Sequence, residues 1–425
     1  MSKKPVPVKM KKTKFGLVPN DWRVASLSDL IEGNYILEHI DGNHGSLYPK
    51  KHEFVEEGVP YIGANSIIEN KINFDNVRFL TEERSDEMQK GIAVPNDVLF
   101  AHNATVGPVA LLGNEYEKVI LSTTLTLYRT NNEIIRSIYL LHYMQSSYYK
   151  KQYEKVMKQS TRNQIPITMQ RNFDFILPPK QEQDKISAIL SAWDKAIELK
   201  QQLIDLKREQ KKGLMQKLLT GEVRLPGFNE EWKVMKLEKL CSKMKSGGTP
   251  KSTNPKFYGG EIPLVKVNDI TRQGKILKDA ETTITEQGLI NSSAWLVPAN
   301  SILYSMYASI GFVSINKMPV TTNQAIMSMI PNDDVNIDFL YYQLVKYKTK
   351  VNSIIETGTQ GNLNAKLVKS FSIHLPQYEE QLAIATILNA AESHIELLEN
   401  ELDALKEQKK GLMQQLLTGK TRVKV

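Results

Sequence analysis

The sequence predicts an α+β protein in which two similar globular domains alternate with two long helices. The stretch EQKKGLMQ occurs at Glu209–Gln216 and again at Glu407–Gln414. Around it, Gln183–Gly221 aligned on Gln381–Gly419 is identical at 21 of 39 positions, at a constant offset of 198 residues. Between these helical segments lie runs of β-branched residues punctuated by Gly and Pro, which is typical of strands. A repeat of such long period indicates two copies of one module.

The order of these segments gives the domain organisation. With 425 residues the chain can bury two or three cores. We expect a flexible basic arm at 1–14, a first globular domain at 15–177, a helical spacer at 178–224, a second globular domain at 225–375 and a second helical spacer at 376–425. The two mixed domains share an opening Trp, a Pro-led apolar run and a Thr pair in the same order while most other letters differ. This pattern favours one scaffold that carries two different surfaces.

Within each globular domain the clearest strands begin at Val98, Val119 and Ser301. Tyr-rich stretches at 137–153 and 338–351 have the spacing of amphipathic helices. Each globular domain is therefore predicted to mix helix and sheet.

The helical spacers carry an apolar seam. In the second copy, apolar residues from Leu388 to Leu405 recur at alternating steps of three and four, which is typical of a coiled coil. In the first copy Lys200 and Lys207 occupy two of these positions, and a leucine stripe lies beside them. We expect the two helices to pair through Ile197, Leu199, Leu203, Ile204, Leu206, Leu388, Ile395, Leu398, Leu402 and Leu405.

Glycines mark the course of these helices. We expect Gly213 and Gly411 to interrupt them, and the Thr-Gly pairs ending at Gly221 and Gly419 to stop them. About 35 helical residues would form a rod of roughly 50 Å.

Charge and cysteine content narrow the class of protein. The chain has 55 Lys and Arg against 47 Asp and Glu, a net charge of +8, which favours a polyanionic partner such as nucleic acid. The single cysteine, Cys241, cannot form an internal disulfide. We expect its side chain to be buried in the protein, and the protein to reside in a reducing cytosol. The N-terminal segment lacks the apolar core of a secretory signal, and no apolar run is long enough to span a membrane.

Three short motifs come near to catalytic patterns without completing them. NPKF at Asn254–Phe257 has Lys256 where a methyltransferase motif needs a second Pro. SGGTPKST at Ser246–Thr253 lacks the spacing of a phosphate-binding loop. PNDVLF from Pro95 lacks the acidic-x-Lys continuation of a nuclease centre, and seven His with one Cys give no zinc set. We therefore expect no catalytic residues and no metal ligands in this chain.

Longer motifs carry a resemblance to a known family. Two of them are the paired stretches LPPKQEQDKISAIL from Leu177 and LPQYEEQLAIATIL from Leu375, each of which leads into KKGLMQ and LLTG. The others are PGFNEEW at Pro226–Trp232 and the openings of the two globular domains at Gly247–Ile270 and Asp41–Ile67. With these motifs, and with two globular blocks and two long helices in strict alternation, the chain resembles the specificity subunits of type I restriction-modification systems over essentially all 425 residues.

The resemblance implies a fold and a function. Two target recognition domains would each read one half of a bipartite DNA sequence, and the two helices would lie antiparallel as the spacer. Two modification subunits would bind the helices and methylate adenine, and restriction subunits would add an ATP-dependent translocating nuclease. S-adenosylmethionine, ATP and Mg²⁺ would be bound by those partners, with no cofactor in this chain.

Residues that can read base edges or grip phosphates in loops between strands are the candidate DNA contacts. In the first domain they are Asn43, His44, Tyr48, Lys50, Lys51, Asn65, Ser66, His102, Asn103, Thr105, Arg162, Asn163 and Gln164. In the second domain they are Thr249, Lys251, Ser252, Lys256, Lys266, Asn268, Tyr307, Ser309, Gln360, Asn362 and Asn364. Any one of them could instead be a turn residue or a solvated surface residue.

Three other functions stay open at this point. The chain could be the reader subunit of a related methylase–nuclease system, a self-sufficient nuclease, or a coiled-coil structural protein without a role on DNA. Strongly salt-dependent DNA binding would exclude the last of these.

Overall fold

The computed structural model describes residues 9–159, 162–307, 309–357 and 363–425. The chain divides into two compact units, Met1–Lys200 with Glu401–Val425 (unit 1) and Gln201–Asn400 (unit 2). Each unit therefore holds one globular domain together with about half of each long helix, whereas the helices were predicted as separate segments.

Both predicted long helices are present. Helix α6 spans Lys180–Leu218 and helix α11 spans Tyr378–Leu416, with 39 residues each. The expected interruption at Gly213 and Gly411 is wrong, because both helices continue through these glycines. One helical glycine destabilises by only about 1 kcal/mol relative to alanine, and tertiary packing of a long helix offsets that easily. The helices stop where predicted, before Gly221 and Gly419, whose φ angles are 73° and 69°.

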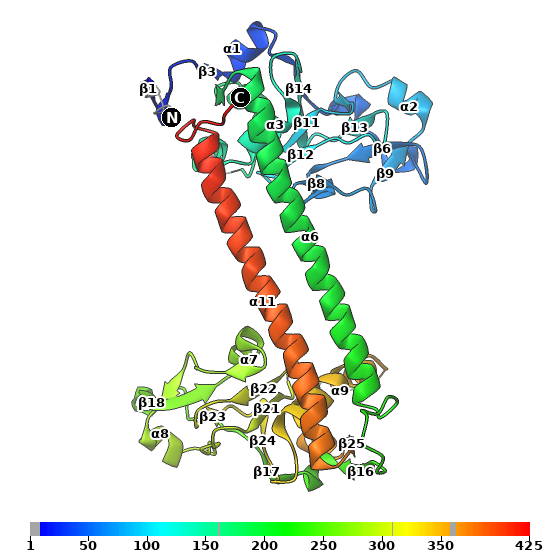
Figure 1. Ribbon diagram of the computed structural model, residues 1–425, viewed down its shortest axis with the longest axis vertical. Coiled ribbons are helices and arrows are strands. Elements are labelled where there is room, and N and C mark those ends of the chain that lie inside the picture. Colours follow the sequence, from blue (N-terminus) through cyan, green and yellow to red (C-terminus); the bar gives the residue numbers. More distant parts are fainter. Residues whose placement is uncertain (1–8, 160–161, 308, 358–362) are drawn as a thin grey trace, which may run out of the picture. The chain divides into compact units, whose positions relative to one another are not determined.

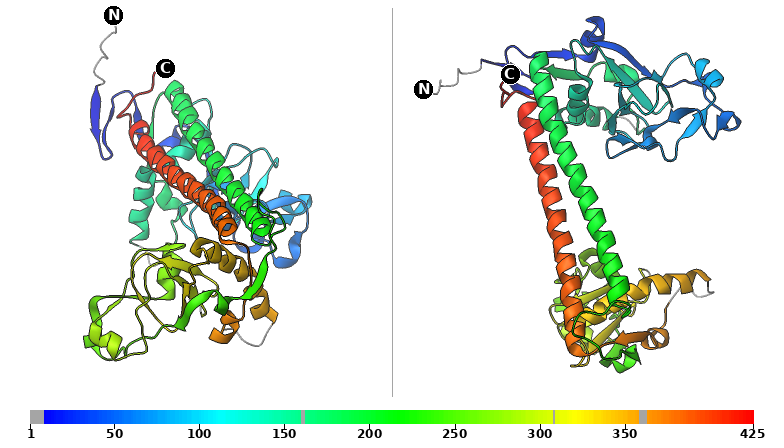
Figure 2. Two further views of the ribbon diagram at one scale, coloured as in Figure 1. Left: turned by 60° about the horizontal axis from the view of Figure 1, so that its bottom comes forward. Right: turned by 45° about the vertical axis from the view of Figure 1, so that its right-hand side comes forward.

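The two helices pair antiparallel within each unit, which confirms the arrangement that the family resemblance implied. In unit 1 Lys200 bonds to Glu401 over 2.8 Å, and Lys409 bonds to Asp194. In unit 2 Arg208 lies 2.5 Å from Glu399 and Lys211 lies 2.9 Å from Glu392. In both units the number on one helix rises as the number on the other falls, and the two ribbons run side by side in each view (Figures 1 and 2).

The seam on α6 differs from the prediction. Leu199, Leu203 and Leu206 are 52%, 37% and 65% exposed, so the leucine stripe does not join the pairing. The buried face instead contains Ile204, and the half-buried Lys200 and Lys207 belong to the same face. A lysine can occupy such a position because its aliphatic stem packs while its ammonium reaches the edge, where that of Lys200 meets Glu401.

On α11 the seam follows the predicted pattern of burial. Leu388, Ile395, Leu398 and Leu402 are buried, and Leu405 is half-buried, as is Ile197 on α6.

The first globular domain is built from small sheets and short helices. A four-stranded sheet has the order β12-β11-β14-β4, and a five-stranded sheet has the order β10-β13-β6-β9-β5. The strands are β1 (Met10–Thr13), β2 (Gly16–Pro19), β3 (Arg23–Ser26), β4 (Ile36–Asp41), β5 (Phe54–Val55), β6 (Val59–Ile62), β7 (Ile67–Ile68), β8 (Lys71–Ile72), β9 (Arg78–Leu80), β10 (Ile92–Ala93), β11 (Val98–Ala101), β12 (Val109–Leu111), β13 (Val119–Leu121), β14 (Leu125–Thr130) and β15 (Asp174–Leu177). The helices are α1 (Leu27–Glu32), α2 (Glu82–Asp86), α3 (Ser137–Met144), α4 (Ser147–Met157) and α5 (Ile167–Gln170).

The second globular domain repeats the plan with different lengths. Its main sheet has the order β17-β24-β21-β22-β19, beside a three-stranded sheet β20-β18-β23. The strands are β16 (Lys233–Lys236), β17 (Cys241–Ser246), β18 (Tyr258–Val265), β19 (Ile276–Leu277), β20 (Thr283–Ile284), β21 (Ile302–Ser305), β22 (Val313–Asn316), β23 (Thr321–Thr322), β24 (Ile326–Pro331) and β25 (Ser372–Leu375). The helices are α7 (Val267–Gln273), α8 (Glu286–Ile290), α9 (Ile337–Thr357) and α10 (Ala365–Lys369).

The Tyr-rich stretches form the predicted helices and pack inward. The first is broken into α3 and α4 because the Ser146 side chain accepts a hydrogen bond from the backbone N–H of Tyr149 and starts a new helix. Tyr139, Tyr143 and Tyr149 are buried in the core of unit 1, and the hydroxyl of Tyr143 donates to the carbonyl of Asp174. This core holds the strands that carry the loops described below.

Candidate nucleic-acid interface

Two of the predicted loops of the first domain are brought together. Asn103, in the loop after β11, forms an antiparallel bridge with Gln164. The side-chain amide of Asn163 donates to the carbonyl of Ala104 over 2.6 Å. The backbone N–H of Ile165 donates to the carbonyl of His102 over 2.8 Å. Residues far apart in the sequence thus form one polar surface, which also presents the exposed side chains of Thr105 and Arg162.

The tip of this surface has an uncommon backbone. Ala104 has a φ of 64°, in the left-handed region that alanine rarely adopts. The side chain of Asn103 accepts from the N–H of Ala104 over 2.8 Å, and Asn163 bonds to the carbonyl of the same residue. A non-glycine residue in this region costs on the order of 1 kcal/mol or more and persists because its surroundings hold it. The loop is therefore fixed before any ligand arrives.

The second domain makes the corresponding connection. The N–H of Leu363 donates to the carbonyl of Met306 over 3.3 Å, and Leu363 lies 198 positions after Ile165. Tyr307 is 37% exposed, Ser309 is half-buried, and Asn364 caps α10 by accepting from the N–H of Leu367. The candidates Gln360 and Asn362 lie outside the described residues.

The remaining candidate DNA contacts of the first domain fall into a buried group and an exposed group. Three side chains are buried and held inside the protein. The amide of Asn43 donates to the carbonyl of Lys90 over 2.5 Å, Ser66 accepts from the N–H of Gly63, and His102 bonds to the hydroxyl of Thr126. These three side chains are 2%, 8% and 3% exposed, and their contact with DNA stays a prediction.

The others reach the surface. His44, Tyr48, Lys50, Lys51 and Asn65 are exposed. Tyr48 packs edge-on against Tyr61, with 6.3 Å between the ring centroids, which restricts its motion. His44 lies 2.7 Å from the Asp41 carboxylate. This segment offers two lysines and one ordered aromatic ring to a polyanion.

In the second domain the candidates after β17 are exposed as a group. They are Thr249, Lys251, Ser252, Lys256, Lys266 and Asn268. The hydroxyl of Thr249 donates to the side chain of Gln324 over 2.9 Å, which joins this loop to the one that follows β23. Gln324 and the exposed Lys243 and Lys245 on β17 were not among the residues predicted from the sequence. The alternation of lysines in CSKMKS was the signal for the latter pair, because alternate residues of a strand share one face.

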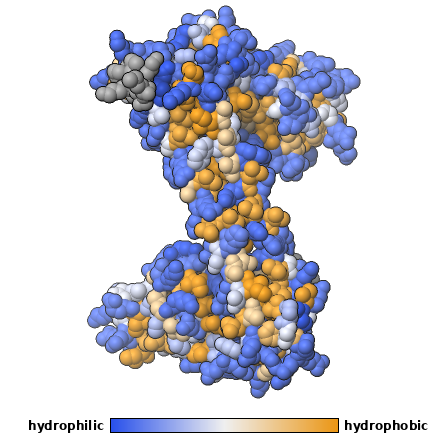
Figure 3. Space-filling model, viewed as in Figure 1, coloured by the Kyte–Doolittle hydropathy of each residue, from blue (hydrophilic) through white to orange (hydrophobic). Residues whose placement is uncertain are grey.

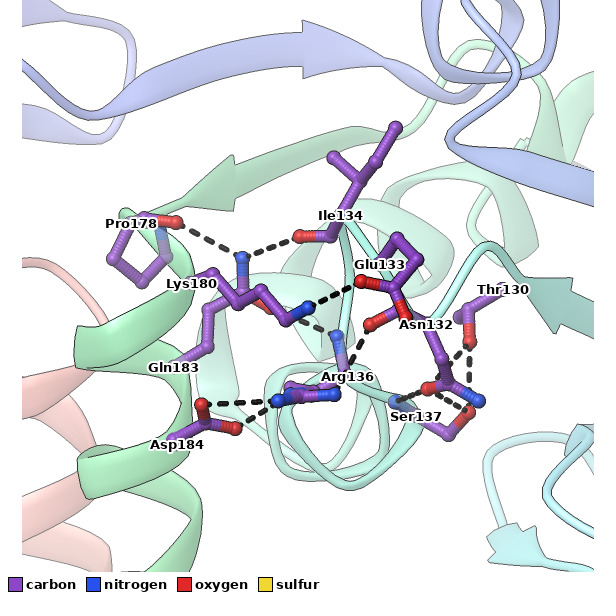
Figure 4. A network of polar contacts seen from close by, with 10 residues as sticks. All are labelled: Thr130, Asn132, Glu133, Ile134, Arg136, Ser137, Pro178, Lys180, Gln183 and Asp184. Carbon is purple, nitrogen blue, oxygen red and sulfur yellow. Dashed lines mark hydrogen bonds and ion pairs between the residues drawn. The ribbon is translucent and has the colours of Figure 1, made fainter.

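A buried glutamine ties each globular domain to its helix. Gln183 in the first turn of α6 donates its side-chain amide to the carbonyls of Ile134 and Pro178, over 3.0 and 2.9 Å. Its side-chain oxygen accepts from the N–H of Arg136 over 2.9 Å, and the Arg136 guanidinium meets Asp184 (Figure 4). The loop before α3 is thereby fixed against the start of α6.

Metal ligands and membrane spans were the other possibilities for the described part of the chain. Within it, no set of three or more His, Cys, Asp or Glu side chains could hold a metal ion. None of its helices combines the length and the apolar character needed to cross a bilayer. What the surfaces offer is exposed lysine, arginine, asparagine and threonine on fixed loops, the residue types that contact phosphates and base edges.

The fold and these surfaces define a duplicated DNA-reading scaffold, and the comparisons give its family. The model of the type I restriction modification DNA specificity domain matches residues 19–208 and 229–407. The chain therefore belongs to the type I restriction-modification DNA specificity family, as a non-catalytic recognition subunit.

Curated relatives match over nearly full length. The chain is 28% identical to the putative type I restriction enzyme MjaX specificity subunit of Methanocaldococcus jannaschii, covering 97% of both chains. It is 25% identical to the MjaVIII specificity subunit of the same organism, covering 96% of this chain and 94% of that one.

Two solved structures show a similar fold. One was reported as the structural basis of complex assembly and conformational transition of the type I R-M system, with a TM-score of 0.62, 18% identity, and 95% and 99% of the two chains covered. The S subunit of a type I system from M. genitalium has a TM-score of 0.54, 15% identity, and 93% and 96% covered.

Proposed function

We propose that the two polar loop surfaces contact DNA, each on one half of a split target. The observation that carries this proposal is the joining of two loops at corresponding positions of both domains, by Ile165 with His102 and by Leu363 with Met306. The scaffold is repeated while the exposed side chains differ, so the two surfaces would read two different DNA sequences. Asn103, Thr105, Arg162, Asn163 and Gln164 are the proposed contacts at the first of them.

Lysines around these loops would supply the sequence-independent part of binding. Lys50 and Lys51 in the first domain, and Lys251 and Lys256 in the second, are exposed. Each phosphate contact that they make would release a counterion and add to the salt dependence. Asn65, Asn268 and Tyr307 are the neighbouring candidates for base or sugar contacts.

The helices are the proposed docking surface for the other subunits. Leu199 on α6 and Leu397 on α11, 198 positions apart, are 52% and 55% exposed, and apolar side chains reach the surface of these segments (Figure 3). The EQKKGLMQ stretch is also repeated. Two equivalent patches suit two copies of one partner, the modification subunit, and restriction subunits would join that complex. S-adenosylmethionine, ATP and Mg²⁺ would be bound by those partners, and the complex would act in the cytoplasm, where the DNA is.

A salt titration of DNA binding tests the proposal. Lys50→Ala with Lys51→Ala in the reconstituted complex should lower the slope of log affinity against log salt by about 2, since each lost phosphate contact removes about 0.9. Lys420→Ala, also an exposed lysine of unit 1, should leave the slope unchanged. An unchanged slope in the double variant would exclude this loop from the interface.

A further inference from the structure

Unit 1 contains a cluster of Trp, Glu and Arg at the junction of its domain and helices. Glu182 in the first turn of α6 is buried, and its carboxylate accepts from Arg422 Nε over 2.7 Å and from a second guanidinium nitrogen. Trp22 Nε1 donates to the same carboxylate over 3.4 Å. The guanidinium also bonds to both oxygens of Asp21, each over 3.0 Å. One arginine thus joins the start of the first domain to the start of α6.

Unit 2 repeats the cluster. Arg224 Nε and Nη2 each donate to the Glu380 carboxylate over 2.8 Å, and Trp232 Nε1 donates to it over 3.0 Å. Both arginines and both glutamates keep the spacing of 198 residues. The arginines also lie near the tryptophan rings, with 6.0 Å in unit 1 and 5.7 Å in unit 2 between guanidinium carbon and centroid.

The two clusters differ in the chain segment that supplies the arginine. Arg224 lies in the segment that links α6 to the second domain. Arg422 comes from the segment after α11 and lies 240 residues from Glu182, whereas Arg224 lies 156 residues from Glu380, so both pairs are long-range contacts. That segment approaches closely, because a Cβ on Gly419 would lie 2.4 Å from the Pro19 ring. The close approach at Gly419 and the paired contacts of Arg422 fix the same corner of the domain.

We propose that Arg422 is a positioning residue for the first recognition domain and that Arg224 is the same for the second. Each would set the angle at which its domain meets the helix start, and so the aim of its loops. The proposal rests on the proposed function, in which each domain reads one half of the target. Contacts to base edges tolerate displacements of only about 0.5 Å, so a loosened junction would weaken discrimination. Every group of one cluster belongs to one unit, so the effect stays with one half of the target.

The test uses the complex reconstituted with its modification subunits. Exchange of 15–177 first assigns the half-site of the first domain, and methylation rates are then measured on duplexes altered in one half or the other. Arg422→Ala should reduce discrimination in the first half at least fivefold and leave the second half unchanged. Arg224→Ala should give the mirror image, and Arg422→Lys, which keeps the charge without the planar fork, should be intermediate.

The outcomes separate the two proposals. If Arg422→Ala changes both halves equally, or neither, the positioning role is wrong. If the unsubstituted complex shows no division into two independently read halves, the proposed function fails first. Should Arg422→Ala prevent assembly, Trp22→Phe and Asp21→Asn keep the shape of the cluster while weakening its bonds. They should lower discrimination in the first half alone, and no change in either variant would overturn the inference.

Discussion

Gln183 and Gln381 lie 198 positions apart and make the same three hydrogen bonds in their respective units. Gln183 bonds to Ile134, Pro178 and the N–H of Arg136. Gln381 donates to the carbonyls of Asp334 and Pro376 and accepts from the N–H of Asn336. Identical glutamines at identical places on two helices are the clearest sign that one junction was duplicated while the loops beyond it diverged.

Replacing this glutamine should destabilise its own unit. Gln183→Leu keeps the volume but leaves two buried carbonyls and one N–H without their partner, at a cost of about 2–4 kcal/mol. Urea unfolding of the chain, monitored with one spectroscopic probe in each unit, measures this loss of stability. Lys180→Ala, which removes the exposed pair with Glu133 in the same network, is the matched control and should not shift the transition (Figure 4). Equal stability of both variants would contradict the role given to Gln183.

The seam can be tested against the exposed stripe on one helix. Ile204 is 1% exposed and Leu206 is 65% exposed. Ile204→Ala should lower the free energy of unfolding by about 2–4 kcal/mol, because it leaves a cavity between the helices. Leu206→Ala should change it by less than about 0.5 kcal/mol. Thermal or urea unfolding of the two variants measures both losses of stability. A larger loss for Leu206→Ala than for Ile204→Ala would show that the leucine stripe belongs to the pairing face.

Stability of unit 1 should fall in mild acid. Burial lowers the pKa of His39, His102 and His142 from 6.5 to about 4. Between these values the unfolded chain binds protons that the folded unit does not, so this contribution is complete above pH 6.5 and is lost as pH falls toward about 4. Urea unfolding between pH 7.5 and 5 should show the decline. His142→Gln should make it shallower, whereas a flat profile in the unsubstituted chain would contradict the burial.

Asn163 should hold the loop that carries Ala104 rigid. Ala104→Gly relieves the left-handed backbone but loosens the unfolded chain, two effects of similar size that oppose each other. Asn163→Ala removes the bond to the Ala104 carbonyl and should increase amide hydrogen exchange at residues 103–106 without changing the core. Exchange measured by mass spectrometry tests this, and unchanged exchange would show that Asn163 does not hold the loop.

Much of the fold follows from periodicity and repetition. The 198-residue offset and the helical spacing predicted α6 and α11, and the β-branched runs at Val98 and Val119 predicted β11, β13 and β14. The face of α6 that packs against α11 could not be predicted correctly, because hydropathy alone ranks Leu199 and Leu206 above Lys200. Only the partner helix, with Glu401 beside Lys200, shows that a lysine stem belongs in the seam.

The candidate site was predictable in composition and less so in geometry. Sequence patterns identified loops rich in polar residues, but not that Asn43 and His102 turn inward, since their internal partners lie 47 and 24 residues away. The arginine clusters were missed because Arg422 and Glu182 meet only in the folded chain. The paired tryptophans Trp22 and Trp232 were the available signal.

We expect the two domains to read separate half-sites at a distance set by the helix pair. Inserting four residues, about one helical turn of 5.4 Å, into the middle of both α6 and α11 keeps their antiparallel pairing. Mapping methylated adenines on DNA treated with the reconstituted complex gives the result directly. We predict the same two half-sites separated by one or two additional base pairs, since each base pair spans 3.4 Å. An unchanged gap, or altered half-site sequences, would show that the helix pair does not set this distance.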